Sequence, residues 1–124
     1  MQTSGLSGII LYVADMQAQV EFYRDTMGLK LAHPVELPNY ADQHWVVFET
    51  GACRLALHSG GRPRAGVGTP KLVFAVSDIV GARAELAARG LALEQVFSPA
   101  PGIEVANGHD PEGNPLCIES HGGG

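Results

Sequence analysis

The chain has 124 residues, of which 45% are apolar, and its formal net charge is −5. This length can fold as one compact domain with a hydrophobic core, and the apolar share excludes an intrinsically disordered chain. The eight Lys and Arg residues are scattered along the sequence, which argues against nucleic acids and anionic membranes as partners.

The first residues and the cysteines indicate a compartment. "MQTSGLSG" lacks the basic and then apolar pattern of a signal peptide, and no apolar run approaches the ~20 residues of a membrane span. Cys53 and Cys117 each lie alone in an apolar, strand-like run, so both are expected to be buried free thiols. We therefore expect a protein of the reducing cytoplasm.

The first half of the chain predicts a strand, a helix and three further strands. After a strand over about 6–13, Asp15 stands where a helix N-cap belongs, and Gly28 is a natural helix end. Between them an apolar stripe recurs at spacings of four, three and four residues, at Met16, Val20, Tyr23 and Met27. Strand-like runs then follow over 30–37, 43–50 and 52–59.

The second half repeats this order after a glycine- and proline-rich segment, "GGRPRAGVGTP". A strand over 70–76 leads to Asp78, a second predicted N-cap, and to an alanine-rich helix that should end at Gly90. Strands are then expected over 93–97, 103–107 and 116–120. The predicted organisation is a single domain over 1–124, with module 1 at 5–59, a linker at 60–69, module 2 at 70–120 and a disordered tail at 121–124.

The two halves are copies of one pattern. Each has Val-x-Asp before its helix and Gly-Leu after it, and Asp lies 13 residues before Gly in the first copy and 12 in the second. We therefore predict an α+β fold of two βαβββ modules. One helix covers one face of each sheet, and the two sheets are expected to form a curved, cup-shaped mixed sheet whose hollow is a ligand site.

The C-terminal segment "HDPEGNPLCIES" predicts a hairpin. Asp110 can accept hydrogen bonds from nearby backbone amides, Pro111 favours the first central turn position, and Gly113 permits a positive φ. The strand that follows contains Glu119, whose carboxylate is either a ligand contact or a polar strand end.

These features resemble the vicinal oxygen chelate (VOC) superfamily, which includes glyoxalase I, the bleomycin-resistance proteins and the extradiol dioxygenases. The resemblance rests on the repeated Val-x-Asp, on "EFYRDTMGLKL" and on "DPEGN". It covers nearly the whole chain and implies the glyoxalase/bleomycin-resistance fold. Because the superfamily contains metal-dependent enzymes and metal-free binders, the fold does not by itself imply an activity.

The resemblance also indicates where metal ligands would lie, at one position on each of four central strands. The matching positions in this chain are Gly8, Ala56, Lys71 and Cys117. Glycine and alanine carry no ligand atom, and a lysine ammonium repels a divalent cation. We therefore expect no metal cofactor, with a divalent metal kept as an alternative.

The remaining candidates are residues that alternation along the strands places near these positions. His58 and Glu119 lie two residues beyond Ala56 and Cys117, so each shares a face with its neighbour. They are interpreted as polar anchors for an organic ligand, as strand ends that reach solvent, or as a displaced metal site, although two ligands rarely hold zinc or iron.

Aromatic side chains extend the list. Tyr12 should share the face of Gly8, as a ligand contact or as core packing. Trp45 is a potential stacking platform, but alternation does not show which face it occupies, and packing is the other interpretation. Cys117 is expected to be an inert thiol, although Lys71 could lower its pKa, and Lys71 itself could be a Schiff-base amine or a solvated strand end. The candidate ligand-binding set is Tyr12, Trp45, His58, Lys71, Cys117 and Glu119.

The sequence thus predicts a metal-free protein that binds and sequesters an antibiotic or another apolar or aromatic ligand. The alternative is a metal-dependent lyase, isomerase or dioxygenase with a divergent metal site, and a third class is a partner module without catalysis. A small-molecule ligand and a homodimer are expected, because two modules leave sheet edges that need cover.

Overall fold

The structure is a computed structural model that describes residues 1–2, 6–62 and 70–122. The chain divides into two compact units, Met1–Pro63 and Arg64–Gly124. Each unit contains a strand, a helix and three further strands in that order, so the predicted α+β class and the repeated βαβββ pattern are confirmed. None of the described helices is long and apolar enough to cross a membrane.

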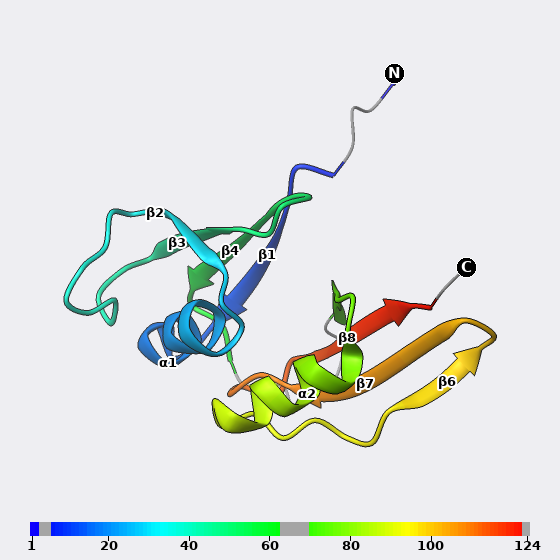
Figure 1. Ribbon diagram of the computed structural model, residues 1–124. Coiled ribbons are helices and arrows are strands. Elements are labelled where there is room, and N and C mark those ends of the chain that lie inside the picture. The colour runs from blue at the N-terminus through cyan, green and yellow to red at the C-terminus, as the bar shows by residue number, and fades with distance from the viewer. Residues whose placement is uncertain (3–5, 63–69, 123–124) are drawn as a thin grey trace. The chain divides into compact units, whose positions relative to one another are not determined.

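The first unit is a four-stranded mixed sheet with its helix on one face (Figure 1). The strand order is β1-β4-β3-β2, in which β1 is parallel to β4 and the other neighbours are antiparallel. The elements are β1 (Gly8–Val13), α1 (Met16–Glu21), η1 (Phe22–Thr26), β2 (Lys30–His33), β3 (Trp45–Glu49) and β4 (Arg54–Ser59).

The helix of this unit begins as the sequence predicts. The Asp15 carboxylate accepts a hydrogen bond from the Ala18 amide at 3.0 Å, which satisfies one of the amides left open in the first turn. The buried stripe includes Met16, Val20 and Tyr23. After Glu21 the chain widens into the π-helical turn η1, and Gly28 then takes a φ of 75° to leave the helix.

The second unit repeats the topology. Its strand order is β5-β8-β7-β6, with β5 parallel to β8 and α2 packed against β7 and β8 (Figure 1). The Asp78 carboxylate caps α2 by accepting from the Gly81 amide at 3.1 Å, and the helix buries Ile79 and Leu86. The elements are β5 (Leu72–Ala75), α2 (Ile79–Ala88), β6 (Phe97–Ala100), β7 (Ile103–His109) and β8 (Pro115–His121).

The predicted strands differ from the observed ones by a residue or more at their ends, and two of them differ by four residues at one end. The strand expected over 30–37 ends at His33, because Pro34 has no amide hydrogen to continue the ladder. The strand expected over 93–97 begins only at Phe97. Leu93 is instead a buried anchor at 5% exposure, and its carbonyl accepts a hydrogen bond from Arg83 of α2 at 3.1 Å.

The C-terminal hairpin forms as predicted and extends further than predicted. Asp110 Oδ1 accepts from the amides of Glu112 and Asn114, both at 2.9 Å, and Gly113 has a φ of 86°. Strand β8 includes His121, and the Gly122 amide donates to the Gly102 carbonyl at 2.6 Å. Strand pairing therefore extends one residue into the segment predicted as a tail at 121–124, because His121 pairs with Ile103 of β7. Residues 123–124, and residues 63–69 of the predicted linker, lie outside the described residues.

Candidate functional site

The sheet face of the first unit that is opposite α1 carries a row of three rings. Tyr12 of β1 and Trp45 of β3 both stand across from His58 of β4 in the strand register. The His58 ring centroid lies 5.1 Å from that of Tyr12 and 5.8 Å from that of Trp45. Tyr12 is 58% exposed and Trp45 is 38% exposed, so the row presents aromatic surface rather than core.

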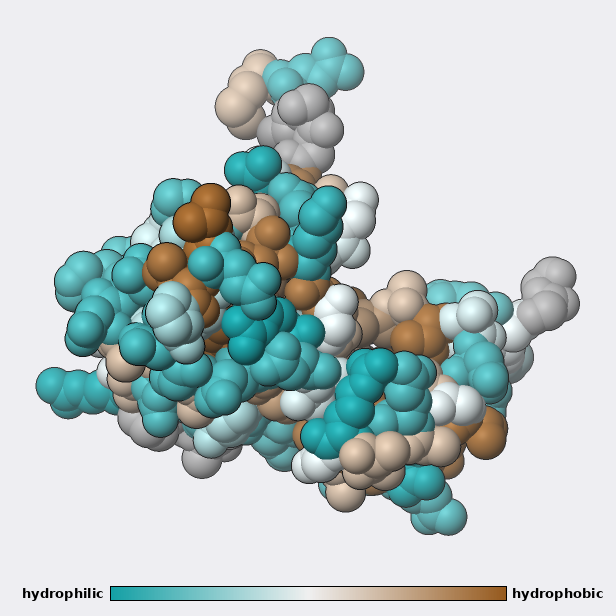
Figure 2. Space-filling view, turned by 60° about the vertical axis from the view of Figure 1, so that its left-hand side comes forward, coloured by the Kyte–Doolittle hydropathy of each residue, from teal (hydrophilic) through white to brown (hydrophobic). Residues whose placement is uncertain are grey.

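Apolar and then charged residues continue this face, which we call the open face of the first unit. The next row on the same face holds Ile10, Ala56 and Val47, of which Ile10 is 47% exposed and the other two are buried. The row beyond ends at the ion pair between Arg54 Nε and Glu49 Oε1, 2.8 Å apart. Hydrophobic patches also reach the surface of the molecule in Figure 2.

His58 has one ring nitrogen already occupied. Its Nδ1 lies 2.7 Å from the Ser59 carbonyl oxygen. Because a carbonyl only accepts hydrogen bonds, Nδ1 carries the proton. In the neutral imidazole Nε2 then keeps its lone pair and is an acceptor.

The face of the second unit's sheet that carries Cys117 and Glu119 is more polar. One row places Asn107 and Val73 on either side of Cys117, and the next places Ala75 and Val105 on either side of Glu119. Asn107 Oδ1 is buried without a hydrogen-bond partner among the described residues. Glu119 Oε2 lies 3.3 Å from His121 Nε2, so this half-buried carboxylate gains an ion pair whenever His121 is protonated.

The environment of Cys117 agrees with an inert thiol. The residue is 3% exposed, and burial raises its pKa because the thiolate would lose hydration. The positive charge of Lys71 acts in the opposite direction and is the smaller effect. Lys71 itself is exposed and directly precedes β5, in agreement with a solvated strand end.

His58 and Glu119 occupy equivalent places in the two units. His58 stands across from Tyr12, four residues after Gly8, and Glu119 stands across from Ala75, four residues after Lys71. The equivalence inferred from the sequence repeat therefore holds in the strand register. The two residues differ in surroundings, since His58 lies between two aromatic rings and Glu119 lies between alanine and valine.

The four positions that the family resemblance gives for metal ligands do not fit a cation. Gly8 and Ala56 lie on the open face of the first unit and offer no donor atom. In the second unit, Lys71 is cationic and Cys117 is held as a buried thiol. The described residues contain no cluster of three or more His, Cys, Asp or Glu side chains that could hold a metal ion.

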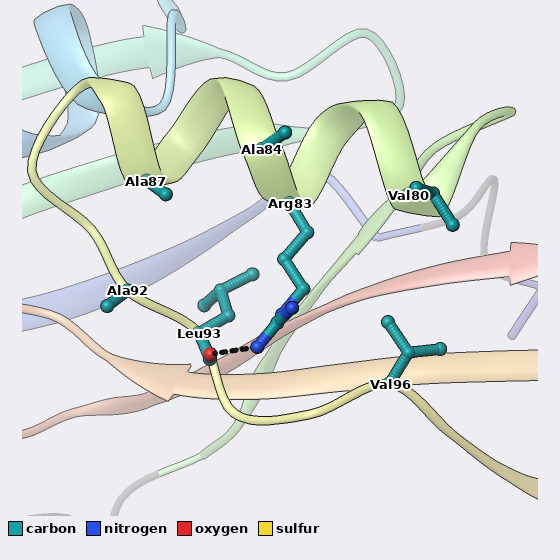
Figure 3. A pocket seen from close by; sticks show the side chains of 7 residues that line it. All are labelled: Val80, Arg83, Ala84, Ala87, Ala92, Leu93 and Val96. Carbon is teal, nitrogen blue, oxygen red and sulfur yellow. Dashed lines mark hydrogen bonds between the residues drawn. The ribbon is translucent and has the colours of Figure 1, made fainter.

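A groove lies in the second unit, between α2 and the segment before β6 (Figure 3). It has a volume of about 310 Å³ and is an open groove. Arg83 crosses it and donates to the carbonyls of Glu94 and Leu93 at 3.0 and 3.1 Å. The other lining side chains are apolar: Val80, Ala84, Ala87, Ala92, Leu93 and Val96.

The structure therefore unites three of the six predicted site residues in one row, Tyr12, Trp45 and His58. It places the other three, Lys71, Cys117 and Glu119, in or next to the sheet of the second unit. Sequence reasoning missed Asn107, which the register puts beside Cys117. Its position could have been predicted from the sequence. Asn107 and Val105 are two residues apart on a predicted strand and therefore share a face, and that strand was expected to pair with the strand that contains Cys117 and Glu119.

Comparison with known proteins places the chain in a family. The sequence model of one protein family, the Glyoxalase/Bleomycin resistance protein/Dioxygenase superfamily, matches residues 5–118 of this chain. No curated protein matches the sequence.

Solved structures share the fold. Lactoylglutathione lyase from Agrobacterium tumefaciens is 23% identical with a TM-score of 0.74, over 97% of this chain and 96% of that chain. TnmS3, an antibiotic binding protein from Streptomyces sp. CB03234, is 22% identical with a TM-score of 0.77, over 98% of both chains. At these identities the likeness concerns the fold alone. Because the family match spans nearly the whole sequence, the chain belongs to the Glyoxalase/Bleomycin resistance protein/Dioxygenase superfamily.

Proposed function

We propose that this protein binds a small organic molecule with an aromatic group, and that it does so without a metal ion at the family's ligand positions. The observation that carries the proposal is the row of Tyr12, His58 and Trp45 on the open face of the first unit. Exposed rings side by side are costly to leave in water and stack well on a planar ligand.

The residues around the row support an apolar ligand rather than an anion. Ile10, which is 47% exposed, extends the surface that a planar molecule would cover, whereas Ala56 and Val47 of the same row are buried. Arg54 is already paired with Glu49. The net charge of −5 also favours neutral or cationic ligands over anionic ones. A fold shared with an antibiotic binding protein makes an aromatic antibiotic a sensible first candidate.

The proposed biological role is sequestration of such a molecule in the cytoplasm by a homodimer, with no nucleic acid involved. The ends of the two sheets support association, because β1, β2, β5 and β6 each pair with a strand on one side only within the described sheets. Light scattering tests this part. A mass near twice 13.0 kDa is the expected result, and 13.0 kDa would contradict the dimer.

The binding proposal is tested by calorimetric titration with 2-naphthol, 2-methoxynaphthalene and a panel of aromatic antibiotics. Saturable one-site binding of at least one of them, accompanied by a change in Trp45 fluorescence, is expected. Absence of binding across the whole panel contradicts the proposal. Elemental analysis of protein purified without chelator tests the metal-free part, which stoichiometric zinc, nickel, iron or manganese would refute.

A further inference from the structure

The orientation of His58 defines which chemical group it can recognise. The Ser59 carbonyl, 2.7 Å from Nδ1, holds the proton on that nitrogen. The neutral ring therefore has its lone pair on Nε2, at the end of the ring away from the main chain. The His58 ring makes this hydrogen bond and contacts the two neighbouring rings.

The rings of Tyr12 and Trp45 determine which ligand groups can approach His58 Nε2. Tyr12 and Trp45 are the register partners of His58 on the two adjacent strands, and neighbouring strands lie about 4.8 Å apart. A planar molecule that covers either ring thus has its edge within reach of the imidazole. No carboxylate stands in this row, and the charged pair of this face, Arg54 with Glu49, lies two rows away.

We propose that His58 is the specificity-determining residue of the site, and that it selects aromatic ligands with a neutral hydroxyl donor, such as phenols. The hydroxyl donates to Nε2 while the aromatic plane contacts Tyr12 or Trp45. An ether of the same shape offers no proton, and a carboxylate places its lone pairs against that of Nε2. This inference rests on the proposed binding function and adds the class of ligand to it.

A matched pair of probes measures the preference. 2-Naphthol and 2-methoxynaphthalene share the ring system and differ in the donor, and 2-naphthoate replaces it with an anion. In calorimetric titrations at a pH of about 8, where ordinary imidazoles are neutral, 2-naphthol should bind roughly two- to tenfold more tightly than the ether, the range for one neutral hydrogen bond. Equal affinities, or a preference for 2-naphthoate, would overturn the proposal.

Variants at one position separate stacking from hydrogen bonding. His58→Phe keeps a ring and removes the acceptor, so it should bind both neutral probes with the same affinity. His58→Gln keeps an acceptor oxygen and should retain part of the preference for 2-naphthol. Circular dichroism confirms that each variant is folded, and a preference that persists in His58→Phe would contradict the assignment.

A measurement without any ligand keeps this inference separate from the binding function. Long-range ¹H–¹⁵N correlation spectra at a pH of about 8 report which imidazole nitrogen carries the proton, and the His58→Gln spectrum identifies the His58 signals. The expected result is a protonated Nδ1 and a bare Nε2. A proton on Nε2 would refute the inference even if aromatic probes bind, whereas failure of every probe to bind, with Nε2 bare, would refute the selection of phenols together with the proposed function.

Discussion

Trp45 and His58 face each other across the β3–β4 ladder, with their rings edge to face at 75°. Trp45 is the only tryptophan in the sequence, so its fluorescence reports directly on this contact. A ligand that covers the open face of the first unit must change the surroundings of an indole that is 38% exposed. Trp45 fluorescence can therefore be used to follow ligand binding at the proposed site.

Removing either aromatic flank should weaken aromatic ligands. Tyr12→Ala and Trp45→Ala are each expected to lower the affinity for 2-naphthol roughly two- to tenfold, because an aromatic contact contributes about 0.5–1.5 kcal/mol beyond the area that it buries. Calorimetric titration measures the loss. Val80→Ala is the matched control, since Val80 is 71% exposed and lines the groove beside α2. A loss confined to Val80→Ala would move the site to that groove.

The hairpin turn should depend strongly on Asp110. This side chain is 5% exposed and accepts hydrogen bonds from two backbone amides and from the Asn114 side-chain amide at 2.8 Å. Asp110→Ala leaves these donors unpaired in the interior, which should cost about 3 kcal/mol of unfolding free energy in urea titrations. Asp110→Asn keeps one acceptor oxygen and should cost less. Asp42→Ala, on an exposed loop, should change stability little, and an Asp110→Ala variant as stable as that control would show the bonds to be dispensable.

The cap of α2 should couple Asp78 to Gly81. A methyl group added at Gly81 would collide with the Asp78 carboxylate, which accepts a hydrogen bond from the Gly81 amide. Gly81→Ala normally stabilises an exposed helix by about 1 kcal/mol, but here that gain should be lost with the cap. In an Asp78→Ala background the same substitution should stabilise. A double-mutant cycle in urea measures the coupling, and additive effects would disprove it.

The repeat made most of the fold predictable, because its signals are local. Asp15 and Asp78 specify caps through their own carboxylates, and Gly28 leaves the helix through its own φ. The strand expected at 93–97 failed for a non-local reason. The sequence around Leu93 has a strand-like pattern. In the structure, however, the Leu93 carbonyl accepts a hydrogen bond from Arg83 of α2 and the Leu93 side chain is buried, so the strand begins only at Phe97.

The sequence predicted which residues belong to the candidate site but not how they are arranged relative to one another. Alternation gave His58 and Tyr12 a common face, but the side of Trp45 was undecided because both faces of its strand contain apolar residues. The register settles it: Trp45 pairs with His58, while Val46 and Phe48 are fully buried on the other face. The tautomer of His58 depends on a carbonyl contact that no sequence pattern contains.

The two cysteines should differ in reactivity. Cys117 is buried and its raised pKa keeps it as a thiol, whereas Cys53 is half-buried in a turn. The thiolate is the reactive form, so Cys53 should react first with iodoacetamide and Cys117 only at the rate of unfolding. Mass spectrometry of each cysteine-containing peptide over time measures both rates. The Cys53→Ser variant isolates Cys117, and rapid labelling of that variant in its folded state would contradict the assignment.

The same buried thiol should make stability fall at alkaline pH. Burial raises the pKa of Cys117 above its ordinary value of 9.0, so the folded chain holds this proton more tightly than the unfolded chain does. The resulting stabilisation is complete below pH 9.0 and is lost as the pH rises through the folded pKa, because unfolding then releases the proton. Urea titrations between about pH 7 and 10.5, which bracket the ordinary thiol range, should therefore show a steeper decline for the wild type than for Cys117→Ala. Lysines and tyrosines titrate in both proteins and cancel in the comparison, so parallel declines would show that the thiol proton contributes nothing.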